Sequence, residues 1–336
     1  MIKLIRMTMA LFVSLISFTA FCYGADVSGN LSVNVVSPEA TPKLRGRPHI
    51  ANHTIVADNG SMLRGVHMYA TDNPDFTQWY TTSWFEDMKN NGHFNTVRAF
   101  ARLQGNTMSG IISGLDKLVS LAGQEGFYVL IVDAVVAGGG DPCPSISDLQ
   151  NFWSQIAPRY ANNTNVIYEI MNEPDFCGGS FDASTMENTL YDSIRAAAPS
   201  SPIAAFSIAN PVSPNNGQGV LSMVQAATHI NYSNAVVAYH GYDGTCNPNI
   251  ISDIANVDQG LRSAGYPTML GEVDGETCAS GVGQFSAGIE LIQQYVEQHG
   301  ESWAWLGGQG YKDCATGVHG GGNRDIECIN VTWPAD

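Results

Sequence analysis

The sequence predicts an α/β protein with a (β/α)8 barrel, and three observations lead to that fold class. The 336-residue chain contains eight short apolar runs, segments with helical spacing lie between most of them, and polar residues follow several of the runs. A single barrel of this kind commonly takes about 250 residues or more. Hydrophobic residues make up 44% of the chain, enough for a large core. Strands that alternate with helices favour a parallel sheet, and eight of them favour a closed barrel.

The first 24 residues are expected to be a signal peptide. Lys3 and Arg6 give a positive start, residues 9–21 form an apolar run, and the small residues Gly24 and Ala25 follow. A retained membrane anchor is the alternative, but the run is shorter than the roughly 20 apolar residues that a membrane span needs. We therefore expect a secreted or periplasmic protein that leaves the membrane once the signal is removed.

Residues 25–50 are polar and dotted with proline, so we expect a leader or linker there, with the barrel domain at 51–336. Order is expected to begin with a β-hairpin, in which Asn59-Gly60 separates the short apolar runs 54–58 and 61–63. Asn-Gly is a strong signal for a two-residue turn because both residues accept positive φ. Such a hairpin is suited to closing the bottom of a barrel.

From residue 63 onward, strands and helices are expected to alternate. One helix is predicted from Asp148 onward, with Ser147 as its N-cap and apolar residues at helical spacing on one face. After residue 306 no convincing helical pattern follows, so the last helix is expected to be reduced or missing. The eight expected strands are residues 63–68, 96–101, 128–132, 166–171, 203–208, 235–239, 268–270 and 302–306.

Polar residues lie in or just after several of these strands. In a (β/α)8 barrel, functional groups gather at the carboxyl-terminal face, where the strands end. Two of the polar residues, Glu173 and Glu272, come from well-separated strands, so the fold should bring both to one mouth. The full set is Arg98, Asp133, Asn172, Glu173, His240, Tyr242 and Glu272.

Two carboxyl groups at one mouth are what the hydrolysis of a glycosidic bond requires. One carboxyl must be protonated to help the leaving oxygen depart, and the other must be ionised to attack or to activate water. The alternative interpretation is that Glu173 and Glu272 are ordinary solvated acids in loops. Their neighbours in the sequence argue against it.

Five short motifs occur in a recognisable order. Asn172-Glu173-Pro174 ends the fourth strand and Gly271-Glu272 ends the seventh, while Val97-Arg98, His240-Gly-Tyr242 and Trp303-Ala-Trp305 lie on the second, sixth and eighth. Together they resemble glycoside hydrolase family five, within the clan of retaining barrel glycosidases. Asn-Glu-Pro alone is weak evidence, but five ordered matches from about Val56 to Leu306 are strong.

The resemblance implies roles for these residues. Glu173 would be the general acid/base and Glu272 the nucleophile of a retaining hydrolysis. Asn172 would hydrogen-bond the 2-hydroxyl of the sugar, a contact that strengthens in the transition state. Arg98 and Tyr242 would hold the Glu272 carboxylate, and a nearby cation favours its ionised form.

Three further residues complete the expected site region. His240 would lie beside the acid/base, although a purely structural histidine is an equal alternative. Glu169, on the same strand as Glu173 but deeper, is expected to be the buried partner of a cation. The family often has a histidine in an Asp-x-His pattern on strand three, whereas this chain reads Asp133-Ala134-Val135. That departure leaves catalysis intact but puts the preferred sugar in doubt.

Two tryptophans are expected to contribute to sugar binding. Trp303 and Trp305 share one face of the eighth strand because side chains alternate along a strand. Sugar rings stack on flat aromatic side chains, so we expect at least one of the two to floor the cleft. Trp303 is favoured.

Six cysteines remain after Cys22 is removed with the signal peptide, and an even set in an exported chain favours disulfides. A zinc site is the alternative, but no two cysteines lie close together with metal-ligand spacing. The cysteines follow neighbouring strands in pairs or share the final loop. The expected pairs are therefore Cys143 with Cys177, Cys246 with Cys278, and Cys314 with Cys328.

The charge of the mature chain limits its partners. Without Lys3 and Arg6, the 15 basic residues become 13 against 31 acidic ones, a formal net charge of −18. Such an excess of negative charge argues against nucleic acid and anionic membranes as partners. We expect a monomer that acts on a neutral polysaccharide or oligosaccharide and needs neither cofactor nor metal.

The favoured function is that of a retaining endo-β-1,4-glucanase, similar to cellulases. The preference for glucan rests on the stretch from Phe152 to Glu173, which resembles bacterial endoglucanases more than mannanases. An endo-β-1,4-mannanase is the first alternative. An inactive barrel that only binds polysaccharide is a second alternative, from another class, but such barrels usually lose one of the two carboxylates.

Overall fold

The computed structural model describes residues 46–134, 141–180, 182–209, 216–242, 250–274, 285–306, 311–312 and 319–320. The expected signal peptide and most of the expected leader lie outside these residues. Within the described part of the chain, no helix is long and apolar enough to cross a membrane.

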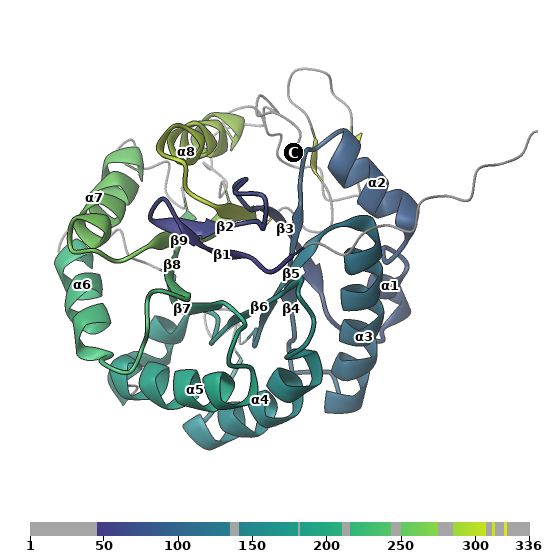
Figure 1. The fold of residues 1–336 in the computed structure, drawn as a ribbon, viewed down its shortest axis with the longest axis horizontal. Helices are drawn as coiled ribbons and strands as arrows, with labels where there is room; N and C mark the ends of the chain where they lie inside the picture. Colours follow the sequence, from purple (N-terminus) through teal and green to yellow (C-terminus); the bar gives the residue numbers. More distant parts are fainter. Residues whose placement is uncertain are drawn as a thin grey trace, which may run out of the picture. The chain divides into compact units, whose positions relative to one another are not determined.

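Eight parallel strands form a closed barrel at the centre of the fold (Figure 1). Their order around the barrel is β10-β3-β4-β5-β6-β7-β8-β9, so each strand pairs with its neighbours in sequence and the last pairs with the first. All eight expected strands are present, which confirms the (β/α)8 fold. Their bounds are β3 Arg64–Tyr69, β4 Thr96–Phe100, β5 Tyr128–Val132, β6 Val166–Glu169, β7 Ile203–Ile208, β8 Ala235–Tyr242, β9 Thr268–Asp274 and β10 Trp303–Trp305.

Helices follow the first seven barrel strands and surround them (Figure 1). The predicted start of α4 is wrong by two residues. Ser145, not Ser147, is the N-cap, because its Oγ accepts from the Asp148 backbone N–H (3.2 Å) while Asp148 accepts from the Ser145 N–H in return (3.0 Å). The helices are α1 Pro74–Thr77, α2 Thr82–Asn90, α3 Met108–Glu125, α4 Ile146–Tyr160, the 3-10 helix η2 Pro174–Ser180, α5 Ala183–Ala197, α6 Asn216–Ala226, α7 Ile250–Ser263 and α8 Phe285–His299.

The segment after β10 is described only in part. β11 (Tyr311–Lys312) and β12 (His319–Gly320) pair in antiparallel fashion. The described residues of this segment contain no helix, and its other residues from 307 onward lie outside the description. A reduced or missing eighth helix therefore stays a prediction.

The N-terminal hairpin lies earlier in the sequence than expected, at the turn before Asn59-Gly60. It is formed by β1 (His49–Ala51) and β2 (Thr54–Val56), joined by Asn52 and His53 with φ of 51° and 62°. Two consecutive positive φ values are typical of the tightest hairpin turns. The expected Asn59-Gly60 turn also exists, but only one bridge, between Val56 and Met62, closes it. The chain cannot pair further there because it enters the barrel as β3 at Arg64.

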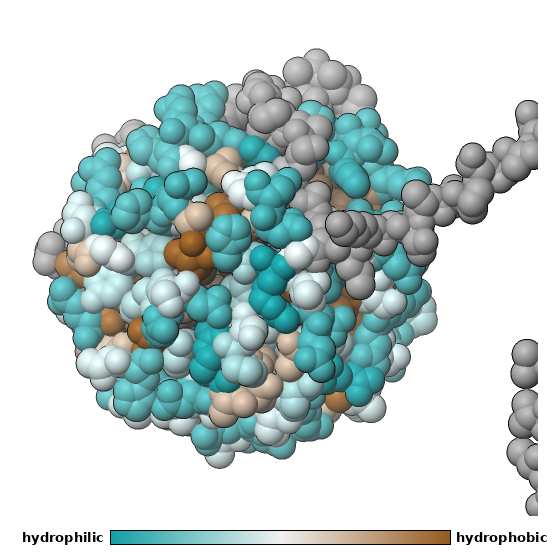
Figure 2. Space-filling view, in the orientation of Figure 1, coloured by the Kyte–Doolittle hydropathy of each residue, from teal (hydrophilic) through white to brown (hydrophobic). Residues whose placement is uncertain are grey.

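This hairpin closes the end of the barrel where the strands begin. Thr54 Oγ1 donates to the carbonyl of Thr268, the first residue of β9, at 2.7 Å. Ile55, Ala57 and Leu63 pack against inward-facing side chains, so the bottom of the barrel is filled, as expected. Figure 1 shows the hairpin in front of the strands, and the same face in Figure 2 has a hydrophobic area over it, with mostly hydrophilic residues over the helices. The inward side chains are Tyr128, Leu130, Ile167, Ala204, Val236, Ala238 and Met269.

The larger part of the core lies between the strands and the helices. Side chains alternate along each strand, so on β5 Tyr128 and Leu130 belong to the inner cluster while Val129 and Ile131 belong to the outer one. This outer layer packs against the side of the strands that faces the helices. Polar side chains at the carboxyl end are therefore carried on a rigid frame.

Candidate active site

Arg98 on β4 is the centre of a buried polar cluster. Its side chain is fully buried, yet every side of the guanidinium meets an acceptor. Nε donates to Glu169 Oε2 at 2.7 Å, Nη2 donates to Asn172 Oδ1 at 2.8 Å, and Nη1 donates to a carboxyl oxygen of Glu272. One arginine thus joins residues from β6, from the turn after β6 and from β9.

The charge of Arg98 is balanced by two carboxylates. Burial alone disfavours a charged guanidinium, but Glu169 and Glu272 outweigh it, and the pKa of Arg98 is raised above its ordinary value. Glu169 binds both Nε and Nη2 of Arg98 in a bidentate pair. The prediction that Glu169 is the buried partner of a cation is confirmed.

Glu272 on β9 lies at the other side of this arginine and is buried. Burial raises the pKa of the Glu272 carboxyl, and the charge of Arg98 is one of the effects that oppose this increase without cancelling it. The contact expected between Arg98 and Glu272 is therefore present. The net direction of the pKa is upward, because burial has the larger effect.

Glu173 follows β6 in an uncommon backbone conformation. Its φ is +50°, a left-handed value that non-glycine residues seldom adopt, and its backbone N–H donates to the Ser207 carbonyl at 3.0 Å. Pro174 begins η2 immediately afterwards. Strain of this kind often occurs at functional sites.

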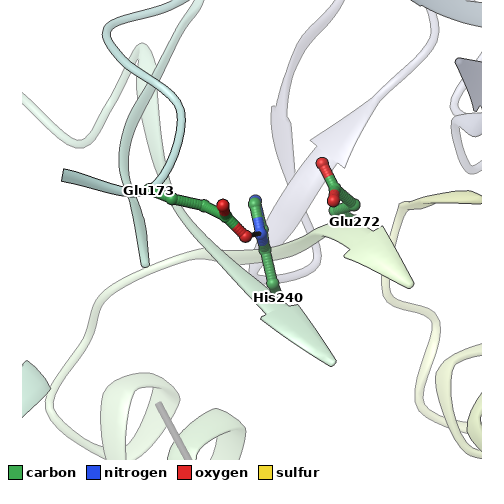
Figure 3. Close-up of side chains that lie close together, drawn as sticks. All are labelled: Glu173, His240 and Glu272. Carbon is green, nitrogen blue, oxygen red and sulfur yellow. Dashed lines mark hydrogen bonds and ion pairs between the residues drawn. The ribbon is translucent and has the colours of Figure 1, made fainter. Parts of the chain in front are cut away.

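Glu173, His240 and Glu272 converge on one point (Figure 3). One donor atom from each of the three lies within 4.8 Å of the others, so an oxygen of Glu173 and an oxygen of Glu272 are no farther apart than that. Figure 3 shows the two carboxyl groups on either side of the imidazole. Within the described part of the chain, this is the set of side chains that could share a single cation.

His240 on β8 is fully buried and contacts residues on both sides of its ring. Nδ1 lies 3.0 Å from Glu173 Oε1, and Nε2 lies 2.8 Å from Ser207 Oγ. The position expected for His240, beside Glu173, is therefore the position observed.

The sequence did not single out two members of this cluster. His67 on β3 accepts from Arg98 Nη1 at 3.3 Å, and its Nδ1 lies 3.8 Å from Glu272. Burial, with Arg98 adding to it, holds the pKa of His67 well below its ordinary value, so the ring is neutral. A histidine on the inward face of an apolar strand was the signal available. Ser207 stands inside the apolar run of β7, and the sequence there gave no such signal.

Asp133 follows β5 and differs from the cluster around Arg98. Its carboxyl is buried and has no hydrogen-bond partner among the described residues. Burial raises the pKa of Asp133 to about 7. Its backbone carbonyl accepts the Asn172 N–H at 3.1 Å, so Asp133 helps to shape the turn that carries Asn172 and Glu173.

The expectation that Trp303 floors the cleft is wrong. Its indole N–H donates to Glu297 of α8 at 3.0 Å, which places the ring in the layer between barrel and helices. The neighbouring Ala304 lies on the opposite face of β10, because side chains alternate along a strand, and a Cβ on the paired Gly65 would lie 2.9 Å from that of Ala304. Trp305 is buried too, and its indole N–H has no partner among the described residues. A role for Trp305 in binding stays a prediction.

Two other expectations are described only in part. The backbone of Tyr242 ends β8, but its side chain lies outside the described residues. Cys143 and Cys177 form a disulfide with a Cα–Cα distance of 5.6 Å, which confirms one expected pair and the proximity of the loops after β5 and β6. The pairs Cys246–Cys278 and Cys314–Cys328 fall on residues outside the description.

The sequence matches the family model described as cellulase (glycosyl hydrolase family 5) over residues 57–307. This region contains the whole barrel and every residue of the cluster around Arg98. The chain belongs to glycosyl hydrolase family 5. It is therefore a glycoside hydrolase by family.

Individual relatives agree with family 5 membership. Endoglucanase E-5 of Thermobifida fusca is 28% identical over 191 residues, which cover 56% of this chain and 38% of the relative, so the match spans well under half of the relative's length. The catalytic domain of Thermobifida fusca endoglucanase Cel5A with cellotetraose matches with a TM-score of 0.61 at 20% identity over 78% of this chain and 84% of that one. A β-glucanase from Saccharophagus degradans matches with a TM-score of 0.60 at 21% identity over 79% and 85%. At such identities the structures support the fold.

Proposed function

We propose that this protein is an endo-β-1,4-glucanase that acts with retention of configuration, with Glu173 as general acid/base and Glu272 as nucleophile. The observation that carries the proposal is the short spacing of the two carboxyl groups, whose nearest oxygens are within 4.8 Å. Retaining glycosidases hold their carboxyl groups about 5–5.5 Å apart, whereas inverting ones need roughly 6.5–9.5 Å to admit a water.

In the first step, a carboxylate oxygen of Glu272 forms a bond to the anomeric carbon while the bond from that carbon to the leaving oxygen breaks. Glu173 transfers its proton to that oxygen. Glu272 loses its negative charge when the ester bond forms. The charge of Arg98 is then balanced mainly by Glu169. Asn172 accepts from Arg98 through Oδ1, and its amide N–H group would donate to the 2-hydroxyl of the sugar.

In the second step, Glu173 as carboxylate removes a proton from water, and the water oxygen attacks the anomeric carbon from the side that the leaving group vacated. The bond to Glu272 breaks, and both glutamates return to their first state. Two inversions give net retention. Of the three residues that converge in the site, Glu173 thus transfers the proton and Glu272 attacks the anomeric carbon.

The substrate is proposed to be a neutral β-1,4-glucan. Support comes from the endoglucanase and β-glucanase names of the relatives and from the negative charge of the chain, which repels anionic polymers. A β-mannan is the alternative that the missing strand-three histidine leaves in place.

A hydrolysis panel tests the proposal. Soluble cellulose derivative, barley glucan, galactomannan, xylan and chitosan are compared, and the anomeric configuration of the first product is followed by NMR. We expect the highest rate on the glucans, with retention, and loss of nearly all turnover in Glu272→Gln but not in the exposed Glu86→Gln. A galactomannan preference would replace the substrate, and an inverted product would overturn the mechanism.

We also propose that residues 1–24 direct export and are removed, that residues 25–50 link to the barrel domain, and that the mature protein acts as a secreted or periplasmic monomer. The disulfide between Cys143 and Cys177 supports an oxidising compartment. The N-terminal sequence of the protein purified from the medium or periplasm, with its mass in solution, tests these statements.

A further inference from the structure

A chain of hydrogen bonds runs from the Arg98 pair to the proposed acid. Ser207 Oγ lies 2.5 Å from Glu169 Oε1 and 2.8 Å from His240 Nε2, and His240 Nδ1 lies 3.0 Å from Glu173 Oε1. Glu169, Ser207 and His240 are fully buried. Each contact needs one proton, so the protons can be placed in order along the chain.

The first two contacts fix the proton of Ser207. Glu169 is paired with the Arg98 guanidinium, and a carboxylate accepts hydrogen bonds but cannot donate. The proton between Glu169 and Ser207 must therefore be the hydroxyl proton of Ser207. With its only proton used, the Ser207 oxygen faces His240 Nε2 as an acceptor, so Nε2 carries a proton.

The remaining contact then determines where the catalytic proton sits. A neutral imidazole with a proton on Nε2 has a bare lone pair on Nδ1. When the ring is neutral, the proton between Nδ1 and Glu173 Oε1 comes from the carboxylic acid form of Glu173, whereas a second proton on the ring would make Nδ1 the donor. We propose that Ser207 is a positioning residue that fixes the Nε2–H tautomer of His240 and thereby keeps Glu173 protonated for its role as general acid. This inference rests on the proposed function.

The backbone of β7 is shaped to bring Ser207 into this position. Between Ala205 and Ile208 the pairing with β8 shifts by one residue, and Phe206 and Ser207 have φ of 75° and 39°. A β-bulge of this kind redirects a side chain, and bulges are frequent beside active sites. Ser207 thereby contacts residues on both sides of β7: its side chain meets His240 on β8, and its carbonyl accepts from the Glu173 N–H after β6.

Nitrogen NMR of histidine side chains tests the tautomer directly, without reference to activity. The protein is labelled with ¹⁵N-histidine, and the His240 signals are assigned by their loss in His240→Asn. We expect a protonated Nε2 and a bare Nδ1 in the wild type. In Ser207→Ala the proton should move to Nδ1, since Nε2–H would lose the Ser207 oxygen as its acceptor. A doubly protonated ring or an Nδ1–H tautomer in the wild type would overturn the proposal.

Two substrates separate the role of Ser207 from general damage. Cello-oligosaccharides need a proton on their leaving oxygen. In 2,4-dinitrophenyl β-cellobioside the leaving group is dinitrophenolate, which departs without one. For Ser207→Ala we expect the basic limb of kcat/KM on cello-oligosaccharides to move down by about one pH unit, the effect of one lost buried hydrogen bond. The kcat/KM for release of dinitrophenolate, which reports the first step, should stay within about twofold of the wild type.

Four further variants decide between explanations. Ser207→Gly removes the hydroxyl but relieves the positive φ, so it should behave like Ser207→Ala if the hydroxyl matters and like the wild type if only strain does. Ser207→Thr keeps the hydroxyl and should restore the basic limb. Ser154→Ala, on the exposed face of α4, should change nothing. If Glu173→Gln loses the cello-oligosaccharide reaction while Ser207→Ala keeps a normal limb, the proposed function stands and the role of Ser207 is refuted.

Discussion

At the scale of single residues, Arg98 holds two carboxylates that would otherwise repel each other in a buried space. Glu169 takes a bidentate share of the guanidinium and Glu272 takes the remaining face. Breaking a buried ion pair by removing one partner is costly, because the other charge is left without compensation. The arginine therefore has a structural part, through Glu169, and an electrostatic part, through Glu272.

Replacing Arg98 tests the electrostatic part. The pKa of Glu272 is already raised by burial, and Arg98 acts against that rise. Because the nucleophile must be ionised, Arg98→Ala should move the acidic limb of kcat/KM upward by about 1–3 pH units. Arg98→Lys keeps a charge but cannot bind both carboxylates in the same geometry, so a smaller shift is expected.

The matched control is Arg159→Ala, which breaks a surface pair with Asp116. It should leave the pH profile unchanged. Far-ultraviolet circular dichroism establishes that each variant is folded. A large loss of activity in Arg98→Lys with an acidic limb at the wild-type pH would mean that Arg98 serves to place Asn172, not to ionise Glu272.

At the scale of elements, the sequence was sufficient for the barrel strands and insufficient where the backbone departs from regular pairing. Continuous apolar runs mark strands buried on both sides, so all eight could be located. The hairpin was placed too late, since Asn52 and His53 form an uncommon turn pair and Asn59-Gly60 is a common one. Trp303 was assigned to the wrong face, because alternation says which residues share a face but not where that face points.

Ser207 could not have been found by the same means. A bulge shifts the alternation by one residue, and the sequence of β7 has no glycine or proline to announce it. Arg98, Asn172, Glu173, His240 and Glu272 were accessible because barrel topology alone brings strand ends together.

The hairpin provides a prediction at this scale. Ile55 is fully buried in the bottom of the barrel, away from the catalytic cluster. Ile55→Ala should lower the free energy of unfolding by about 2–5 kcal/mol through lost burial and a cavity. The exposed His49→Ala on β1 is the control. Denaturant unfolding measures the loss, and KM should remain that of the wild type, since the strands keep their carboxyl ends in register.

At the scale of the whole molecule, several carboxyl groups other than the catalytic pair are buried at a cost. Burial raises the pKa of Glu187 to about 8 and that of Glu301 to about 8, the latter with Asp258 adding to the effect. Tyr239 donates to Glu301 at 3.1 Å, which satisfies one oxygen but does not outweigh burial. Glu187 lies on α5 and Glu301 lies just before β10, so neither is one of the strand-end residues around Arg98.

These groups make stability depend on pH. Because the pKa of Glu301 in the folded state is above the ordinary value of 4.5, its stabilising effect is complete below about pH 4.5 and is lost as the pH rises to about 8. The neutral His67 acts in the opposite direction, because its folded pKa is lowered.

The contribution of Glu301 is therefore best isolated by comparing the wild type with Glu301→Gln. The variant should lose stability relative to the wild type at pH 5, where Glu301 is protonated and hydrogen-bonded, and gain at pH 8.5, with a crossing between. Melting temperatures across that range, with the exposed Glu86→Gln as a control that stays parallel to the wild type, measure the difference. A constant offset between wild type and Glu301→Gln at every pH would mean that Glu301 keeps one protonation state throughout.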